Sequence, residues 1–420
     1  MSKAREFIER HRLEADRIRI DEQIGRYLEE MDRGLAGEDS CLLMIPTFLS
    51  PRRDLPRNEP ILCVDAGGTN LRICTAYFDD EGKFCHSDIA KYIMPGVEKE
   101  LDADEYFTLV ADFVRPYLAD SRNICISFAY RTKVTDKIDA EIIELTKEVN
   151  VRNPEGRLLG AEVVAALRHM GEDNVRAIVI NDTVAGSLSG RSDFPGYGGY
   201  TGTVLGTGSN SCYSESYANI KKIPNLPAEG EMVINTEAGS YDKMPRTDID
   251  IAFDATTKNP GIGIAEKMTS GAYLGPLCGF TLRVAGAEGV FTTKAIEHLH
   301  HLKSRAASEF LNYDEGAIEE FLLNEEDERA AREILLEVAD RAARLVALQM
   351  AACVMKSVRS SDDMLMTMEG STYEKFYGLK DGIHHHLFSY LESQGIKGRI
   401  ETPEYVVLKG CLIAGLSGLL

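Results

Sequence analysis

The chain has 420 residues, of which 44% are hydrophobic and 27% charged, the balance of a globular protein with roughly two to three domains. This composition excludes a disordered chain and a small disulfide-stapled fold. The net charge of −20 argues against nucleic-acid partners and against docking on an anionic membrane, because an acidic chain repels polyanions. No stretch is apolar enough to span a membrane, and the first ten residues carry charges where a signal peptide is apolar. We therefore expect a cytoplasmic protein.

Nine cysteines lie scattered in apolar contexts with no CxxC motif, which favours reduced, packed thiols over disulfides or a metal site. The tract at residues 384–386 consists of three histidines, but no carboxylate or cysteine stands near it at a helical ligand spacing. The sequence therefore gives no metal-ligand set made of protein side chains alone.

The N-terminal segment has one apolar stripe at Ile24, Leu28, Met31 and Leu35, whose steps of three and four residues predict a helix. Prolines at positions 46, 51, 56 and 60 then indicate a connector, because a helix or central strand does not tolerate this density.

A first glycine turn follows a buried-strand run at residues 61–64 and precedes a second run at 71–78, which predicts a β-hairpin. The turn reads Asp-Ala-Gly-Gly-Thr-Asn at residues 65–70. A glycine pair lets backbone N–H groups approach a phosphate, Thr69 and Asn70 add donors, and Arg72 adds a cation. The carboxylate of Asp65 is suited to Mg²⁺. Taken alone, the segment is equally consistent with an ordinary hairpin turn.

A second glycine turn reads Gly-Thr-Gly-Ser-Asn at residues 206–210, between apolar runs at 201–205 and 211–213. It lacks the third glycine of a dinucleotide-binding fingerprint and opens into a strand instead of a helix. Further buried-strand runs at 124–128, 177–180 and 364–368 alternate with helical segments. Two phosphate-type hairpins, each near the start of its own α/β half, indicate a duplicated nucleotide-binding architecture with a cleft between the halves.

A carboxylate, Asp182, follows the buried run 178–180 and the residue Asn181, at the position where open α/β sheets bind ligands. Partial burial would raise its pKa and suit it to accept a hydroxyl proton. The alternative for Asp182 is a helix N-cap.

Six segments in chain order, from about residue 44 to 373, resemble the motifs of the eukaryotic-type hexokinases of the actin/Hsp70/sugar-kinase superfamily. The two glycine turns resemble the family's phosphate motifs, and residues 181–184 resemble its catalytic strand-end motif. Residues 235–239 and 259–271 resemble sugar-contacting segments, and residues 369–373 resemble the adenosine motif.

Carried over by position, the resemblance implies a role for each matching residue. Asp182 would be the general base for the sugar hydroxyl. The sugar would be bound by Thr146, Lys147, Asn181, Asn210, Glu237 and Glu266. ATP and its Mg²⁺ would be bound by Asp65, Gly67, Gly68, Thr69, Asn70, Arg72, Gly206, Thr207 and Gly208, with Gly370 and Ser371 on the adenine side.

One sugar-contacting segment departs from the family pattern. The usual serine-to-lysine spacing puts Ala129 in the serine position, whereas a two-residue shift restores Ser127, and the family's proline is missing in either register. Arg131 brings a cation near Glu237 and Glu266. It either pairs with one of these carboxylates or is a solvated loop residue.

The resemblance implies an α/β fold of two actin-like (ribonuclease H-like) domains around a cleft, with an N-terminal helix. We expect residues 1–55 to form this helix and a connector, residues 56–185 the small domain, joined by about 400–420, and residues 186–400 the large domain.

The expected activity is transfer of the γ-phosphoryl group of ATP to a sugar hydroxyl, with the 6-hydroxyl of glucose or a related hexose as acceptor, as in glycolysis. A non-catalytic sugar sensor on the same fold would lack the base, and a chaperone- or actin-like ATPase would lack the sugar carboxylates. The oligomeric state does not follow from the sequence.

Overall fold

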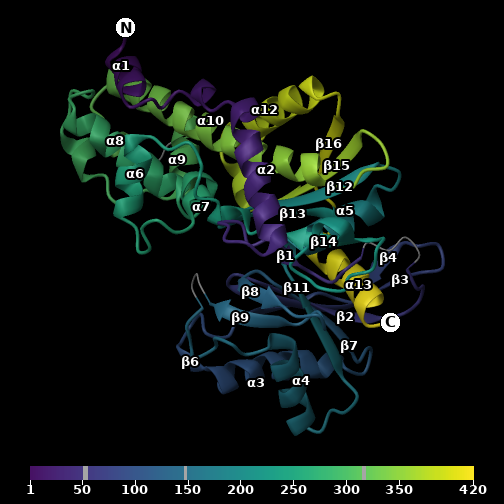
Figure 1. Ribbon diagram of the computed structural model, residues 1–420. Coiled ribbons are helices and arrows are strands. Elements are labelled where there is room, and N and C mark those ends of the chain that lie inside the picture. The colour runs from purple at the N-terminus through teal and green to yellow at the C-terminus, as the bar shows by residue number, and fades with distance from the viewer. Residues whose placement is uncertain (51–54, 146–148, 315–317) are drawn as a thin grey trace.

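The computed structural model describes residues 1–50, 55–145, 149–314 and 318–420, and shows two six-stranded sheets with helices packed around them (Figure 1). Two short strand pairs, β8 with β9 and β6 with β10, accompany the first sheet. The α/β class, and the helix that precedes the first sheet, are as the sequence predicts.

The first sheet has the strand order β11-β7-β2-β3-β4, with β5 paired to β3. Alternate residues of its central strand β2 face opposite layers: Leu62 and Val64 pack with α3 and α4, and Ile61 and Cys63 pack with α13. Both faces are therefore covered, which explains why β2 reads as a continuous apolar run. The strands of this part are β2 (Ile61–Gly67), β3 (Asn70–Phe78), β4 (Phe84–His86), β5 (Ala90–Ile93), β6 (Leu101–Asp102), β7 (Asn123–Phe128), β8 (Arg131–Val134), β9 (Ala140–Glu144), β10 (Val151–Arg152) and β11 (Arg176–Ile180). Its helices are α3 (Ala103–Val114) and α4 (Leu159–His169).

The second sheet has the order β1-β14-β13-β12-β15-β16. Strands β12 and β13 form an antiparallel hairpin, and β15 pairs with β12 in parallel. The strands are β1 (Ile45–Pro46), β12 (Gly199–Leu205), β13 (Ser209–Ser216), β14 (Glu231–Asn235), β15 (Asp363–Glu369) and β16 (Lys397–Glu401).

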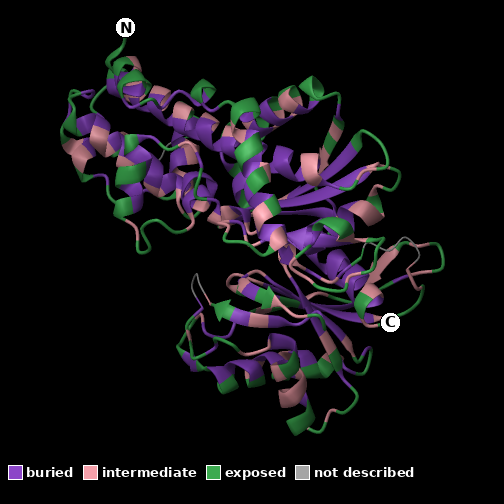
Figure 2. Cartoon of the chain, viewed as in Figure 1, coloured by how far each residue is buried: buried purple, intermediate pink, exposed green. Residues whose placement is uncertain are grey.

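Helices cover most of the second sheet and build the larger core. In the upper part of Figure 2 the strands of this sheet and the helix faces that pack on them are coloured as buried. The long helix α10 runs through this core and contacts α2, α12 and α8. The remaining helices are α1 (Lys3–Arg10), α2 (Ile20–Ala36), α5 (Asp182–Asp193), α6 (Asp248–Ala255), α7 (Ile264–Thr269), α8 (Leu274–Ala287), α9 (Ser304–Leu311), α10 (Glu325–Lys356), α11 (Ser371–Lys375), α12 (Leu379–Ser393) and α13 (Val406–Gly418).

The apolar stripe near the N-terminus forms α2, where Ile24, Met31 and Leu35 are buried and Gly37 ends the helix at φ 78°. The two glycine hairpins form as predicted, with Gly67 opposite Asn70 and Leu205 opposite Ser209. A separate helix, α1, precedes α2 and has no counterpart in the predicted stripe. Within the described ranges, no helix is both long and apolar enough to cross a lipid bilayer.

The C-terminal helix α13 packs against α5 and against strands β2 and β7 of the first sheet (Figure 1). Helix α5 also contacts β12 and β15 of the second sheet. These two helices therefore lie between the sheets and connect them, and α5 begins at Asp182.

Candidate active site

Asp182 lies at the junction of β11 and α5, two residues after the strand ends at Ile180. The N-cap of α5 is Asn181, whose side chain accepts a hydrogen bond from the backbone N–H of Thr183 at 2.9 Å. Oδ1 of Asp182 accepts from the same N–H at 2.8 Å. Capping is therefore shared between Asn181 and Asp182, and Oδ2 of Asp182 takes no part in these contacts.

A network of amides and one carboxylate lies beside this junction. The side-chain amide of Asn210 donates to Oδ1 of Asn235 at 2.7 Å, to Oδ1 of Asn181 at 3.4 Å and to Oε1 of Glu237 at 3.4 Å. The amide of Asn235 donates to the same carboxylate oxygen of Glu237 at 2.8 Å. The structure thus brings together three of the predicted sugar-binding residues, Asn181, Asn210 and Glu237. It adds Asn235, the first residue of the segment 235–239, for which the family resemblance implies no role.

Glu237 is held in an unusual backbone conformation and a charged environment. Its φ of 55° lies in the left-handed region, which non-glycine residues seldom adopt and which recurs at functional sites. Burial raises the pKa of its carboxyl, the hydrogen bond from Asn235 and the charge of Arg131 oppose this rise, and the charges of Asp182 and Glu266 add to it. The negative charges of Asp182 and Glu266 therefore oppose ionisation of the Glu237 carboxyl.

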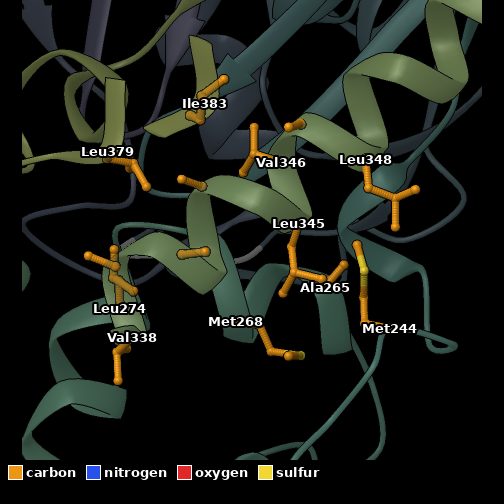
Figure 3. Close-up of a cluster of buried hydrophobic side chains, with 14 of the residues drawn as sticks. Met244, Ala265, Met268, Leu274, Val338, Leu345, Val346, Leu348, Leu379 and Ile383 are labelled. Carbon is orange, nitrogen blue, oxygen red and sulfur yellow. The ribbon is translucent and has the colours of Figure 1, made fainter. Parts of the chain in front are cut away.

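Glu266 lies in the middle of α7, whose neighbours Ala265 and Met268 are buried in the core with Leu345 of α10 (Figure 3). Its carboxylate passes close to two glycines. A Cβ on Gly208 would come within 2.6 Å of Oε1 of Glu266, and a Cβ on Gly239 within 3.2 Å of its Cβ. The glycines of the second turn and of the segment after Glu237 therefore leave the space that this side chain occupies.

The loop before α7 is held by a buried ion pair. Nζ of Lys267 donates to Asp254 at 2.5 Å and to the carbonyl of Asn259 at 2.6 Å, and Asp254 also accepts from the backbone of Gly261 at 2.9 Å. Although burial pushes the pKa of Asp254 upward, the hydrogen bonds from Lys267 and Gly261 hold it below its usual value. The segment 259–261 and the start of α7 are thus fixed relative to α6, so Lys267 positions its neighbour Glu266.

The first glycine turn has the backbone geometry that its sequence predicts. Gly68 adopts φ +62°, and a Cβ on it would meet no atom within 4 Å, so its surroundings are open. The amide of Asn70 donates to the hydroxyl of Thr69 at 3.1 Å. The turn therefore presents backbone and side-chain donors together with Gly67 at the end of β2, as a phosphate site requires.

Asp65 and Arg72 face each other across this hairpin. They are paired in register, and their charged groups are 3.5 Å apart. Burial raises the pKa of Asp65 to about 6, with Arg72 opposing the rise and the charge of Asp182 adding to it. The first phosphate turn and the proposed base are thus close enough to interact.

The second glycine turn is closed by backbone hydrogen bonds. The N–H of Gly206 donates to the carbonyl of Gly208 at 2.9 Å. The segment that precedes α8 also binds the turn. The N–H of Gly271 donates to the carbonyl of Gly206 at 2.8 Å, and the N–H of Ala272 donates to the carbonyl of Thr207 at 3.1 Å. The turn is therefore fixed on the same segment that follows Glu266.

Gly370 and Thr372, on either side of Ser371, lie against the second turn. Gly370 has φ +129°, and a Cβ on it would lie 2.2 Å from the carbonyl oxygen of Leu205, so only glycine fits. Ser371 begins α11, and the hydroxyl of Thr372 donates to the carbonyl of Gly206 at 2.8 Å.

Glu369, at the end of β15, was quoted in the adenosine motif but given no role. Its Oε2 is buried, and among the described residues it has no hydrogen-bond partner. Burial raises its pKa to about 8, and the charges of Asp182 and Asp65 act in the same direction. The pairing of β15 with β12 places Glu369 opposite Val204, at the strand end that leads into the second glycine turn. Because these strands are far apart in sequence, the sequence contains no signal for this position beyond the motif.

The remaining predicted residues are placed as follows. Thr146 and Lys147 fall outside the described residues. Ser127 lies within β7 opposite Ile180 and Asp65, and its buried hydroxyl has no partner in the described part of the chain. Ala129 follows the strand.

Comparison with known proteins identifies the family of the chain. Two family models, both described as hexokinase, match residues 3–192 and 200–411. Hexokinase-1 of Schizosaccharomyces pombe is 31% identical over 265 residues, covering 60% of this chain and 54% of that protein. The glucokinase of Aspergillus niger is 27% identical over 293 residues, covering 61% and 59%. The alignments therefore span little more than half the length of these curated relatives.

The solved structure of a hexokinase from Schistosoma mansoni complexed with glucose matches with a TM-score of 0.82 over 99% of both chains, at 20% identity. This likeness shows that the chain has the fold of that hexokinase, with its two sheets and their covering helices. The two family models together cover nearly the whole chain, and one of them alone matches half of it, so the chain belongs to the hexokinase family.

Proposed function

We propose that this chain is an ATP-dependent hexokinase, which transfers the γ-phosphoryl group of ATP to the 6-hydroxyl of glucose or a closely related hexose. The observation that supports this most strongly is the position of Asp182. Its charge acts on Asp65 and Glu369, beside the phosphate turns, and also on Glu237 among the sugar-binding side chains. A base shared by the two groups is what phosphoryl transfer to a sugar requires.

In this mechanism Asp182 removes the proton of the attacking hydroxyl. Its Oδ1 is held by the backbone of Thr183, which leaves Oδ2 to accept the proton. Fixing one oxygen orients the other, and such positioning supplies much of the rate enhancement in phosphoryl transfer.

The sugar is bound by carboxylates and carboxamides. Asn181, Asn210 and Glu237 are already joined by hydrogen bonds, so a sugar would meet a preorganised set of donors and acceptors. Hydroxyl-directed hydrogen bonds discriminate strongly between polyols, because a missing hydroxyl leaves a buried polar group unpaired.

The phosphates of ATP are bound by the two glycine turns and Arg72, with Gly370 and Ser371 beside the adenine. The residues present fit a magnesium ion bound with the nucleotide: Asp65 offers a buried carboxylate whose ion partner in the described chain is Arg72 at 3.5 Å. Mg²⁺ bound there supplies neutralisation of the phosphate charge.

We also propose that residues 56–185 with about 400–420 form one closing domain and residues 186–400 the other, with 1–55 as N-terminal helix and connector. Closure would exclude water from the reacting groups. We further propose a cytoplasmic location. The acidic composition favours a small-molecule partner over nucleic acid or an anionic membrane, because a chain with a net charge of −20 repels polyanions.

A coupled assay with Mg-ATP and a panel of hexoses tests this function. We expect turnover of glucose or a close relative, far above the rate of ATP hydrolysis without sugar. Sugar binding without phosphoryl transfer would instead support the sensor alternative, and ATP hydrolysis unaffected by any sugar would support an ATPase.

A further inference from the structure

Tyr130 lies beside the tip of the first glycine turn, in the short segment between β7 and β8. Its side chain is 3% exposed, and the centre of its ring lies 4.8 Å from that of Phe128. The N–H of Ala129 donates to the carbonyl of Ala66 at 3.4 Å, which continues the pairing of β7 with β2 beyond the strand end. One position further along, the hydroxyl of Tyr130 donates to the carbonyl oxygen of Gly68 at 2.7 Å. A buried side chain from outside the turn is therefore bonded to its backbone.

This hydrogen bond fixes the peptide unit that joins Gly68 to Thr69. The unit is planar and trans, so its carbonyl and its N–H point in opposite directions. Because the carbonyl is turned toward Tyr130, the N–H of Thr69 points away from it. This N–H donates to no atom in the described part of the chain, and a Cβ on Gly68 would meet nothing within 4 Å. The turn thus offers an unused backbone donor next to open space, as an anion site requires.

The turn cannot hold this orientation by its own side chains alone. Gly68 has no Cβ and adopts φ +62°, so its flanking peptide units are only weakly restricted. The carbonyl of Thr69 is held from outside, because it accepts from the N–H of Met94 at 2.9 Å. Tyr130 provides the corresponding hydrogen bond for the carbonyl of Gly68. Both carbonyls at the tip of the turn are therefore held by residues that lie outside it.

We propose that Tyr130 is a positioning residue of the nucleotide site, which turns the N–H of Thr69 toward a phosphate group and keeps the carbonyl oxygen of Gly68 away from it. This inference rests on the proposed function, because it assumes that a phosphate occupies the first glycine turn. If the peptide unit were rotated, a carbonyl oxygen with a partial negative charge would face the phosphate in place of a donor. The hydroxyl of Tyr130 acts through the backbone, so its effect falls on the binding of phosphates and not on that of the sugar.

The test is calorimetric binding to the wild-type chain and to Tyr130→Phe, which keeps the ring beside Phe128 and removes only the hydroxyl. The probes are Mg-AMPPNP, a non-hydrolysable analogue of ATP, and adenosine, which has no phosphate and is measured by competition. We expect the dissociation constant for Mg-AMPPNP to rise about twofold to tenfold, as for the loss of one hydrogen bond, and that for adenosine to stay unchanged. In the coupled assay the KM for ATP should rise by the same factor, while kcat and the KM for the sugar stay within about twofold.

Tyr92→Phe is the matched control. Tyr92 lies on β5 of the same sheet, and its hydroxyl shares a hydrogen bond with that of Tyr117 at 3.1 Å, outside the turn. This variant also loses one tyrosine hydroxyl from the first half and should bind Mg-AMPPNP as wild type does. Thermal unfolding of both variants shows whether either loss affects the fold as a whole.

Equal affinity of wild type and Tyr130→Phe for Mg-AMPPNP would overturn the proposal. Equal weakening of Mg-AMPPNP, adenosine and sugar would also overturn it, because a structural loss acts on all three ligands. Either result, found in a chain that phosphorylates a hexose, would leave the proposed function intact. A wild-type chain that binds no nucleotide would contradict both the proposed function and this inference.

Discussion

Replacing Asp182 with asparagine keeps the shape of the side chain and its hydrogen bond to Thr183, but it removes the capacity to accept a proton. General-base loss costs typically about 10²–10⁴ in rate. We therefore expect Asp182→Asn to lower kcat by this factor, while the dissociation constant for the sugar, measured by calorimetry, stays within about tenfold. Turnover near the wild-type value in this variant would mean that another group takes the proton.

Asp65 allows a prediction on stability, because burial raises its pKa in the folded chain to about 6 from the ordinary aspartate value of 3.8. A raised folded-state pKa means that the folded chain binds the proton more tightly than the unfolded one. The contribution of Asp65 to the free energy of unfolding is therefore fully present below about pH 4 and is lost as the pH rises through 6. Since one pKa unit is worth about 1.4 kcal/mol, the loss at neutral pH amounts to roughly 3 kcal/mol.

Asp65→Asn should remove this loss. We expect the variant to unfold at a higher temperature than wild type at neutral pH and at the same temperature below about pH 4, while its affinity for Mg-ATP falls. Thermal unfolding across this pH range measures the first effect, and nucleotide binding measures the second. A variant that is less stable than wild type at neutral pH would show that Asp65 is kept ionised at no cost to the fold.

At this scale the sequence predicted residue types better than their surroundings. Asp182, Asn210 and Glu237 could be named because they belong to motifs, and the structure joins two of them through Asn235. The buried Oε2 of Glu369 could not be foreseen, because it depends on the pairing of β15 with β12, two strands that are far apart in sequence.

The individual elements were predictable where one short-range rule decides them. Glycine-rich turns between apolar runs predicted both hairpins, and apolar residues at steps of three and four positions predicted α2. The ion pair between Lys267 and Asp254 was not visible, because it joins residues thirteen positions apart whose side chains meet only when α6 and α7 pack. This pair fixes the loop that leads into Glu266.

Lys267→Met should therefore be strongly destabilising, because among the described residues it leaves the buried Asp254 with Arg246, 3.9 Å away, as its one remaining charged partner. Removing one partner of a buried pair costs about 3–5 kcal/mol, whereas replacing both is far less harmful. We expect urea unfolding to show this loss for Lys267→Met and to show most of it restored in the double variant with Asp254→Asn. Equal stability of the single variant and wild type would mean that the pair does not hold the loop. The double variant should still bind the sugar more weakly than wild type, since Glu266 loses its fixed support.

At the scale of the whole molecule, the two ends of the chain pack beside different sheets. Helix α2 packs on α10 of the second half, whereas α13 returns to cover β2 and β7 of the first. Helix α5 contacts both sheets, and the proposed base is its first residue. A relative movement of the two sheets would therefore act directly on Asp182. The sequence predicted two halves, but the return of the C-terminal helix followed only from the family resemblance.

The proposed sugar-binding residues come from both halves, since Asn181 follows β11 of the first sheet whereas Asn210 and Glu237 lie on or after strands of the second. A sugar that contacts both sets gains binding energy only when the halves approach, so it favours the closed arrangement. ATP, whose phosphate turns also belong to different halves, has no sugar-side contacts and should shift the equilibrium less.

We expect small-angle X-ray scattering to show a smaller radius of gyration with saturating substrate sugar than without ligand, and a smaller change with ATP alone. A sugar that is not phosphorylated and does not bind serves as the control. An unchanged radius in the presence of a sugar that the protein demonstrably turns over would mean that catalysis proceeds without closure, and water would then have to be excluded by the site in its present form.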